Sequence, residues 1–200
     1  MSDTQRHTPG PWVQSGTLIH STLMSASEHH HIARSVGESF KMTHAEALAN
    51  AARIEGTGGD FLFYEEGVSD ATGRLIEALE KERIAIGAKM GITVVPDPAQ
   101  GMRQGYMLAD DYGEAYRTAP GFLGIGAQPQ LDHRYLNEDV GYGLVFMSRL
   151  ARQLDVETPT MDAMIHITSV LMKRAYASEA IRTPTSLGIG DLSAEALGSL

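Results

Sequence analysis

The sequence predicts an all-α protein, a bundle of helices. Apolar residues recur at helical spacing in four stretches, at residues 44–54, 75–90, 138–154 and 158–172. Residues suited to N-capping, Ser69 and Thr158, precede two of these stretches. Within the helical part, a short extended or hairpin segment is expected near residues 60–66, where Phe61 to Tyr64 form a short apolar run.

Composition limits the classes of protein to consider. A length of 200 residues and a hydrophobic content of 42% suit one domain with a real core. The formal charge of −9 argues against nucleic acid or an anionic membrane surface as partner. The absence of cysteine excludes disulfides and thiolate metal sites. Neither an apolar run of about 18 residues nor a signal-peptide pattern occurs, so we expect a cytoplasmic protein without a membrane segment.

Residues 1–40 are expected to form an irregular or weakly ordered segment. Trp12-Val13 and Thr17-Leu18-Ile19 are candidates for short strands. His20 and the run His29 to His31 raise the alternative of a metal site, because imidazole is a common ligand. Adjacent histidines have no spacing that places them all on one face, so we predict a solvated segment and no metal site.

The first helical stretch ends in a glycine-rich turn, Gly56-Thr57-Gly58-Gly59. A phosphate-binding loop is the alternative, but the G-x-G-x-x-G spacing and a preceding strand are both missing. We therefore interpret this turn as the C-terminus of a helix.

The next helix is the clearest in the sequence. Ser69 is its predicted N-cap, Asp70 lies in its first turn, and Gly91 ends it. The run from Glu80 to Arg83 is expected to form a charged, solvated face. We expect this helix to be core scaffold without chemistry.

An acidic and aromatic cluster follows, made up of Asp110, Asp111, Tyr112, Glu114 and Tyr116. Its spacing matches no calcium loop. We predict a solvated helix face that two tyrosines anchor. The irregular loop at residues 120–129 leads into the next motif and is therefore placed to line a substrate pocket.

The stretch from Leu131 to Val145 carries the candidate chemistry. Asn137 is the predicted N-cap of a helix, with Glu138 and Asp139 in its first turn, where the helix dipole favours negative charge. Arg134 lies just outside this turn, free to meet an anion. Such a grouping suits proton transfer on a charged small molecule. The alternative is an ordinary capped helix with solvated charges.

Two glycines lie early in this helix. Gly141 and Gly143 each weaken it by roughly 1 kcal/mol relative to alanine. We interpret this cost as a sign that another helix or a ligand approaches closely. In the last long helix, Pro159 takes the favoured first position, and His166 is expected to be a satisfied structural histidine.

Three separated motifs resemble the octopine/nopaline (opine) dehydrogenase family. DHRYLNEDV at residues 132–140 resembles the HRYL-x-ED signature of that family's C-terminal helical domain. NAARIE at residues 50–55, followed by GDFLFYEEG at 59–67, resembles the opening of the same domain. RTPTSLG at residues 182–188 resembles its closing segment. The resemblance covers residues 41–190, which we take as one substrate domain with a tail at 191–200.

The resemblance implies roles for three residues. By position in the motif, Arg134 corresponds to the arginine that binds the substrate carboxylate, and Asp139 to the aspartate of a catalytic dyad. His44 is the candidate for the catalytic histidine. Here Ala45 follows that histidine and Phe40 stands four residues before it, where the family pattern has proline and asparagine.

The implied reaction joins an amino acid to a 2-oxo acid and reduces the imine with NADH or NADPH. Family members carry a Rossmann domain before the helical one, and this sequence has no strand-Gly-x-Gly-x-x-Gly-helix unit. We therefore assign no cofactor or metal residues. We expect a truncated domain, inactive alone, that needs a separate Rossmann-domain chain; a homodimer is a further expected arrangement. The alternative is a non-catalytic helical module for dimerisation or small-ligand binding.

Overall fold

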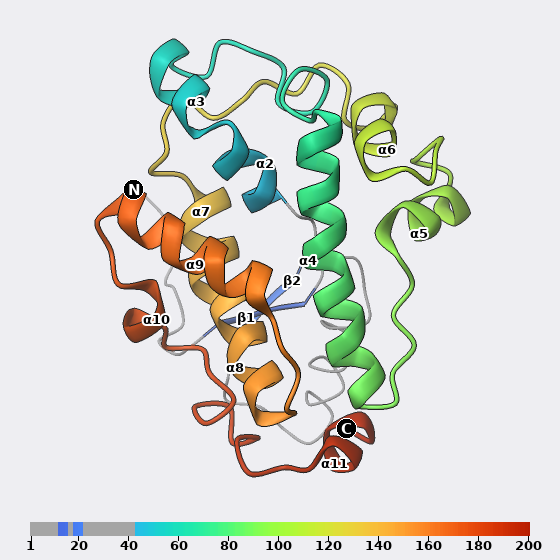
Figure 1. Ribbon diagram of the computed structural model, residues 1–200, viewed down its shortest axis with the longest axis vertical. Coiled ribbons are helices and arrows are strands. Elements are labelled where there is room, and N and C mark those ends of the chain that lie inside the picture. The colour runs from blue at the N-terminus through green and yellow to red at the C-terminus, as the bar shows by residue number, and fades with distance from the viewer. Residues whose placement is uncertain (1–11, 16–17, 22–42) are drawn as a thin grey trace, which may run out of the picture.

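The computed structural model describes residues 12–15, 18–21 and 43–200, and its regular elements are helices apart from one pair of short strands (Figure 1). Strands β1 (Trp12–Ser15) and β2 (Leu18–Ser21) pair antiparallel, with Trp12 opposite Ser21. Both strand candidates are therefore confirmed. The rest of the segment at residues 1–40, including the run His29 to His31, lies outside the described residues.

The helices follow one another through the rest of the chain. In order they are α2 (Thr43–Ala49), α3 (Ala51–Thr57), α4 (Asp70–Lys89), α5 (Asp97–Gln104), α6 (Tyr112–Thr118), α7 (Arg134–Glu138), the π-helix η1 (Asp139–Leu144), α8 (Val145–Gln153), α9 (Pro159–Met172), α10 (Tyr176–Glu179) and α11 (Ala194–Gly198). Helices α4, α8 and α9 pack against one another and enclose the core. Helix α2 lies between α4 and α7 and contacts both (Figure 1).

Helix α4 has the predicted length and cap but not the predicted surface. The Ser69 hydroxyl accepts a hydrogen bond from the Thr72 amide at 3.2 Å. The prediction of a solvated charged face was wrong. The side chains of Glu80 and Arg83 are 0% exposed, and Nη2 of Arg83 lies 2.6 Å from Oε1 of Glu80. Buried charges are stable only when they are paired in this way. Of this run, Lys81 alone is exposed.

Glu82, in the same run, is buried for a different reason. Its carboxylate accepts hydrogen bonds from the amides of Thr160 and Met161 at 2.6 and 2.9 Å. These amides belong to the first turn of α9 and have no partner within that helix. Glu82 thus caps α9 from α4, while the Thr158 side chain at the N-cap position makes no capping hydrogen bond.

The glycine-rich turn and the segment after it were predicted in part. Helix α3 ends at Gly58, whose φ of 62° is left-handed, so the helix C-terminus is confirmed. The extended segment near residues 60–66 is reduced to one antiparallel bridge between Leu62 and Gly126. The loop at residues 120–129 therefore lies against this segment. In the acidic cluster, Tyr116 is buried and Tyr112 half-buried, as expected.

Helices α7, η1 and α8 form one continuous rod that starts earlier than predicted. Its N-cap is His133, whose Nδ1 accepts from the Tyr135 amide at 3.4 Å. Asn137 as N-cap was wrong, because its side chain is bound elsewhere: its Oδ1 accepts from the Tyr176 hydroxyl at 2.6 Å. Asp139 is consequently the first residue of η1 and lies beyond the first turn of the rod, which begins at Arg134.

The expected close approach at the two glycines is found at Gly141. A Cβ atom added there would lie 3.1 Å from the Tyr176 ring of α10. His166 is exposed on α9, so the structural role expected for it was wrong. Within residues 43–200 and the two strands, no helix has the length and apolar character needed to cross a bilayer.

Candidate functional site

Helix α2 carries the histidine of the predicted site into the protein interior. Its first five residues, Thr43 to Ala47, are all buried. His44 is 0% exposed, and burial lowers its pKa from 6.5 to about 3. Burial has this effect because the low-dielectric interior disfavours the charged imidazolium. The His44 ring is therefore neutral at physiological pH in this structure.

Asp139 lies where the helical rod changes from α to π geometry. Single π turns inside α-helices are frequent at functional sites, because the wider turn re-aims its side chains. The Thr43 hydroxyl donates a hydrogen bond to Oδ2 of Asp139. Burial raises the pKa of Asp139 to about 6, while the Thr43 hydrogen bond and the positive charge of Arg134 act in the opposite direction. Asp139 is thus poised to change its charge near neutral pH.

Arg134 is the exposed member of the site. It is the first residue of α7, and its guanidinium carbon lies 5.6 Å from the centre of the Tyr135 ring. In the described ranges, no carboxylate forms an ion pair with Arg134. An exposed guanidinium that pairs with no carboxylate of the described residues can hold a carboxylate from outside through two parallel hydrogen bonds.

The structure brings the three predicted residues onto three elements that contact one another, α2, α7 and η1, but the hydrogen bond between α2 and η1 comes from a residue that the sequence did not reveal. Helix α2 contacts both α7 and η1. In the part of the chain that is described, the hydrogen bond from α2 to Asp139 comes from Thr43, one position before His44. The only sequence signal for Thr43 was this adjacency.

Aromatic side chains and one further carboxyl group complete the surroundings. The ring of Phe63 lies 5.2 Å from that of Tyr135 and 5.1 Å from that of Tyr64. The pKa of Tyr64 is raised, chiefly by burial. Glu46 is 0% exposed, and no sequence motif singled it out. These groups therefore interact electrostatically across α2, α7 and η1.

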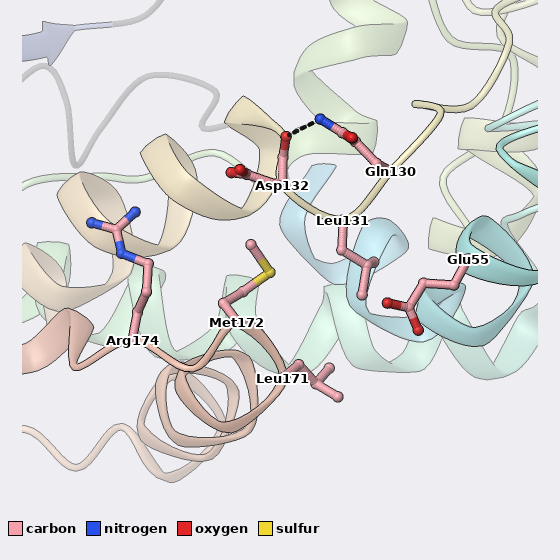
Figure 2. A pocket seen from close by; sticks show the side chains of 7 residues that line it. All are labelled: Glu55, Gln130, Leu131, Asp132, Leu171, Met172 and Arg174. Carbon is pink, nitrogen blue, oxygen red and sulfur yellow. Dashed lines mark hydrogen bonds between the residues drawn. The ribbon is translucent and has the colours of Figure 1, made fainter.

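A separate pocket of about 440 Å³ opens beside the start of α7 (Figure 2). It is lined by Glu55, Gln130, Leu131, Asp132, Leu171, Met172 and Arg174. Arg174 is bound by Glu179, with a shortest contact of 2.7 Å. None of the three predicted site residues lines this pocket, although Asp132 precedes Arg134 by two positions. The loop at residues 120–129, expected to line a pocket, leads into it but contributes no lining residue.

The described residues offer little to a metal or a dinucleotide. Over residues 43–200, no three acidic or histidine side chains group closely enough to hold a metal ion. The described strands form one antiparallel pair. Dinucleotide-binding folds need parallel strands, each followed by a helix, with the phosphates at a glycine-rich turn. The described part of the chain therefore does not suit a nicotinamide cofactor by itself.

Comparison with known families gives a match over most of the chain. The family model described as NAD/NADP octopine/nopaline dehydrogenase, alpha-helical domain, matches residues 15–172. The match thus begins within the segment at residues 1–40 and ends with α9.

Individual proteins agree with this match. An opine dehydrogenase of Arthrobacter sp. (strain 1C) is 36% identical over 154 residues, which are 76% of this chain and 42% of that protein. Vitopine synthase of Allorhizobium ampelinum is 29% identical over 129 residues, or 64% of this chain and 35% of that protein. The chain therefore spans less than half the length of these relatives.

A solved structure shares the fold. Octopine dehydrogenase in complex with NADH and agmatine superposes with a TM-score of 0.65 at 18% identity, over 85% of this chain and 49% of that one. Another structure of octopine dehydrogenase, with NADH and pyruvate, gives a TM-score of 0.55 at 18% identity, over 80% and 46%. At this identity the likeness establishes the helical fold alone.

Proposed function

The chain belongs to the octopine/nopaline dehydrogenase family, as its α-helical domain, and we propose that it supplies the substrate side of an NAD(P)H-dependent opine dehydrogenase. The reaction would condense the amine of an amino acid with the carbonyl of a 2-oxo acid and reduce the resulting imine. The observation that carries the proposal is the Thr43–Asp139 hydrogen bond, because it holds the helix of His44 against the rod that starts at Arg134.

The three site residues then take distinct roles. Arg134 binds the carboxylate of the 2-oxo acid, since its guanidinium is exposed and has no counter-ion among the described residues. His44 accepts or donates the proton at the reacting oxygen or nitrogen. Asp139, ionised above about pH 6, stabilises the imidazolium form of His44. Because His44 is fully buried here, its contact with substrate requires the start of α2 to open.

The nicotinamide cofactor belongs to a different part of the enzyme in this proposal. The described residues do not suit it, so a Rossmann domain must supply it, on a separate chain or elsewhere in the polypeptide. We accordingly expect the isolated chain to bind neither NADH nor NADPH with micromolar affinity, which isothermal titration calorimetry measures.

The carboxylate role of Arg134 can be tested on the chain alone. Saturation-transfer NMR with pyruvate should detect binding to the unaltered protein and lose it in Arg134→Gln. Arg103→Gln is a matched control, because Arg103 is also an exposed helical arginine. Equal pyruvate signals from the two variants would rule out Arg134 as the carboxylate site.

The alternative, a non-catalytic dimerisation module, has one observation in its favour. Helix α9 exposes a run of apolar side chains in its last turns: Ile167 at 47%, Val170 at 63% and Leu171 at 44%. Contiguous exposed apolar side chains mark protein contacts. Sedimentation velocity distinguishes the two accounts: a dimer that Val170→Glu dissociates, together with no effect of Arg134→Gln on pyruvate binding, would favour the module.

A further inference from the structure

Glu46 is a carboxyl group enclosed in the interior beside the proposed site. It is 0% exposed, and neither of its carboxyl oxygens has a hydrogen-bond partner among the described residues. Glu46 follows Thr43 by three residues, and side chains at this spacing share one face of a helix. The Thr43 side chain reaches Asp139 from this face. Glu46 therefore lies on the side of α2 that meets η1.

Among the described residues, the charges that act on Glu46 are both negative. They come from Asp139 at the start of η1 and from Asp97 at the start of α5. Asp97 is itself bound by the Tyr116 hydroxyl, at 2.5 Å. No cation acts on Glu46 from the described residues. The other titratable groups that interact with it are tyrosines of the loop after α3 and of α6 and α7, namely Tyr64, Tyr116 and Tyr135.

Within the described part of the chain, an ionised Glu46 meets neither a hydrogen-bond donor nor a cation. Buried carboxylates need donors or a cation, and like charges within reach add repulsion. Asp139, by contrast, accepts the Thr43 hydroxyl and lies in the field of Arg134. The surroundings of the two carboxyl groups therefore differ: those of Asp139 stabilise the ionised form, and those of Glu46 favour the protonated form.

We propose that Glu46 and Asp139 form a coupled carboxyl pair, in which Glu46 carries a proton and Asp139 carries the negative charge. Glu46 is then a positioning residue, which acts on the chemistry through Asp139. This inference rests on the function proposed for Asp139 and deepens it. Paired acids with different environments are a recurring way to assign acid and base at one site.

The protonation order has a consequence for His44. If Glu46 ionised first, its charge would keep a proton on Asp139, which could then no longer stabilise an imidazolium. Asp139 accepts the Thr43 hydroxyl, whereas neither carboxyl oxygen of Glu46 has a partner among the described residues, so the negative charge is more stable on Asp139. Burial and the charge of Asp139 raise the pKa of Glu46, which acts in the same direction. A neutral Glu46 therefore leaves Asp139 as the charged member of the pair at neutral pH.

Infrared spectroscopy of the full chain tests this pair. At pH 7.5 the protein should show the C=O stretching band of a protonated carboxyl group, and this band should shift when glutamate is labelled with carbon-13. The band should be absent from Glu46→Gln and present in Glu55→Gln, a control at an exposed glutamate of α3. In Asp139→Asn the band should disappear at a lower pH than in the unaltered protein, because the like charge is gone.

Three results would contradict the proposed carboxyl pair. They are the absence of a labelled band from the unaltered protein, a band that persists in Glu46→Gln, and a band that disappears at the same pH in Asp139→Asn as in the unaltered protein. The labelling experiment needs no variant, so it decides even where Glu46→Gln does not fold. It also needs no turnover. Absence of the band would therefore refute the role of Glu46 and leave the proposed function intact. Failure of the unaltered protein to bind pyruvate would instead contradict the proposed function and leave the protonation of Glu46 intact.

Discussion

Thr43 and Asp139 are joined by a side-chain hydrogen bond across 96 positions of the chain. This contact ties the first residue of α2 to the first residue of η1, where the helical rod adopts π geometry. Two features of the proposed site are linked to it: the position of α2, which carries His44, and the ionisation of Asp139.

Replacing Thr43 by valine should raise the pKa of Asp139 further. The hydroxyl stabilises the carboxylate, and hydrogen bonds to charged groups contribute about 1.5–3 kcal/mol, or roughly one to two pKa units. Carbon-13 NMR titration of the Asp139 carboxyl measures the change. Thr43→Ser keeps the donor and should restore the original titration; an unchanged pKa in Thr43→Val would mean that the hydrogen bond contributes nothing.

Acid should destabilise the protein through His44. Its pKa is about 3 in the folded state and 6.5 in the unfolded state, so the unfolded chain binds the extra proton as pH falls below 6.5. Between pH 7 and pH 4.5 this costs roughly 3 kcal/mol of stability.

Urea unfolding at both pH values checks this loss. In His44→Gln, the decrease in the free energy of unfolding between the two pH values should be smaller by about that amount, because glutamine does not titrate. His166→Gln, at an exposed histidine, should lose as much as the unaltered protein. Parallel pH profiles for all three proteins would show that His44 is not held neutral in the fold.

Gly141→Ala should destabilise the rod although alanine favours helix formation. The added Cβ would lie 3.1 Å from the ring of Tyr176. Tyr176 is 2% exposed, and its hydroxyl donates a hydrogen bond to Asn137, so the ring has little room to move. Overpacking of this kind typically costs about 1–3 kcal/mol, against a gain of about 1 kcal/mol in propensity. Gly56→Ala has open space around the new Cβ and should instead stabilise. Thermal unfolding compares the two, and equal stabilisation would contradict the proposed contact.

Glu82→Gln should weaken the start of α9. The carboxylate binds two amides that otherwise have no partner, so its charge contributes about 1–3 kcal/mol. Glu77→Gln, which breaks an exposed pair with Lys81, should cost no more than about 1 kcal/mol. Chemical denaturation measures both; a smaller loss for Glu82→Gln than for Glu77→Gln would show that α9 does not depend on this cap.

Much of the fold was accessible from the sequence where local chemistry decides it. Ser69 and Pro159 set the starts of α4 and α9, and Gly58 ends α3. The predictions failed where tertiary contacts determine whether a side chain is buried. Glu80 and Arg83 look like surface residues in sequence, but each is the other's buried counter-ion.

The rod shows the same limit. Asn137 is a good N-cap by type, but Tyr176 and Arg174 bind its side chain from 37 or more positions away, and the helix starts before it. At the site, the family motifs led to His44, Arg134 and Asp139. Thr43 and Glu46 could not be found in this way. The hydrogen bond of Thr43 reaches across 96 positions, and the burial of Glu46 depends on the tertiary packing of α2, which no local pattern encodes.

The most direct test is a chimera in which this chain replaces the matching helical segment of the Arthrobacter opine dehydrogenase, to which it is 36% identical. The chimera would be incubated with NADH or NADPH, pyruvate and a mixture of amino acids, and products identified by mass spectrometry. Our account predicts a secondary-amine dicarboxylate, lost in His44→Ala, Asp139→Asn and Arg134→Gln and kept in Arg103→Gln. A folded chimera that binds the cofactor but forms no such product, or forms it equally in the three site variants, would contradict it.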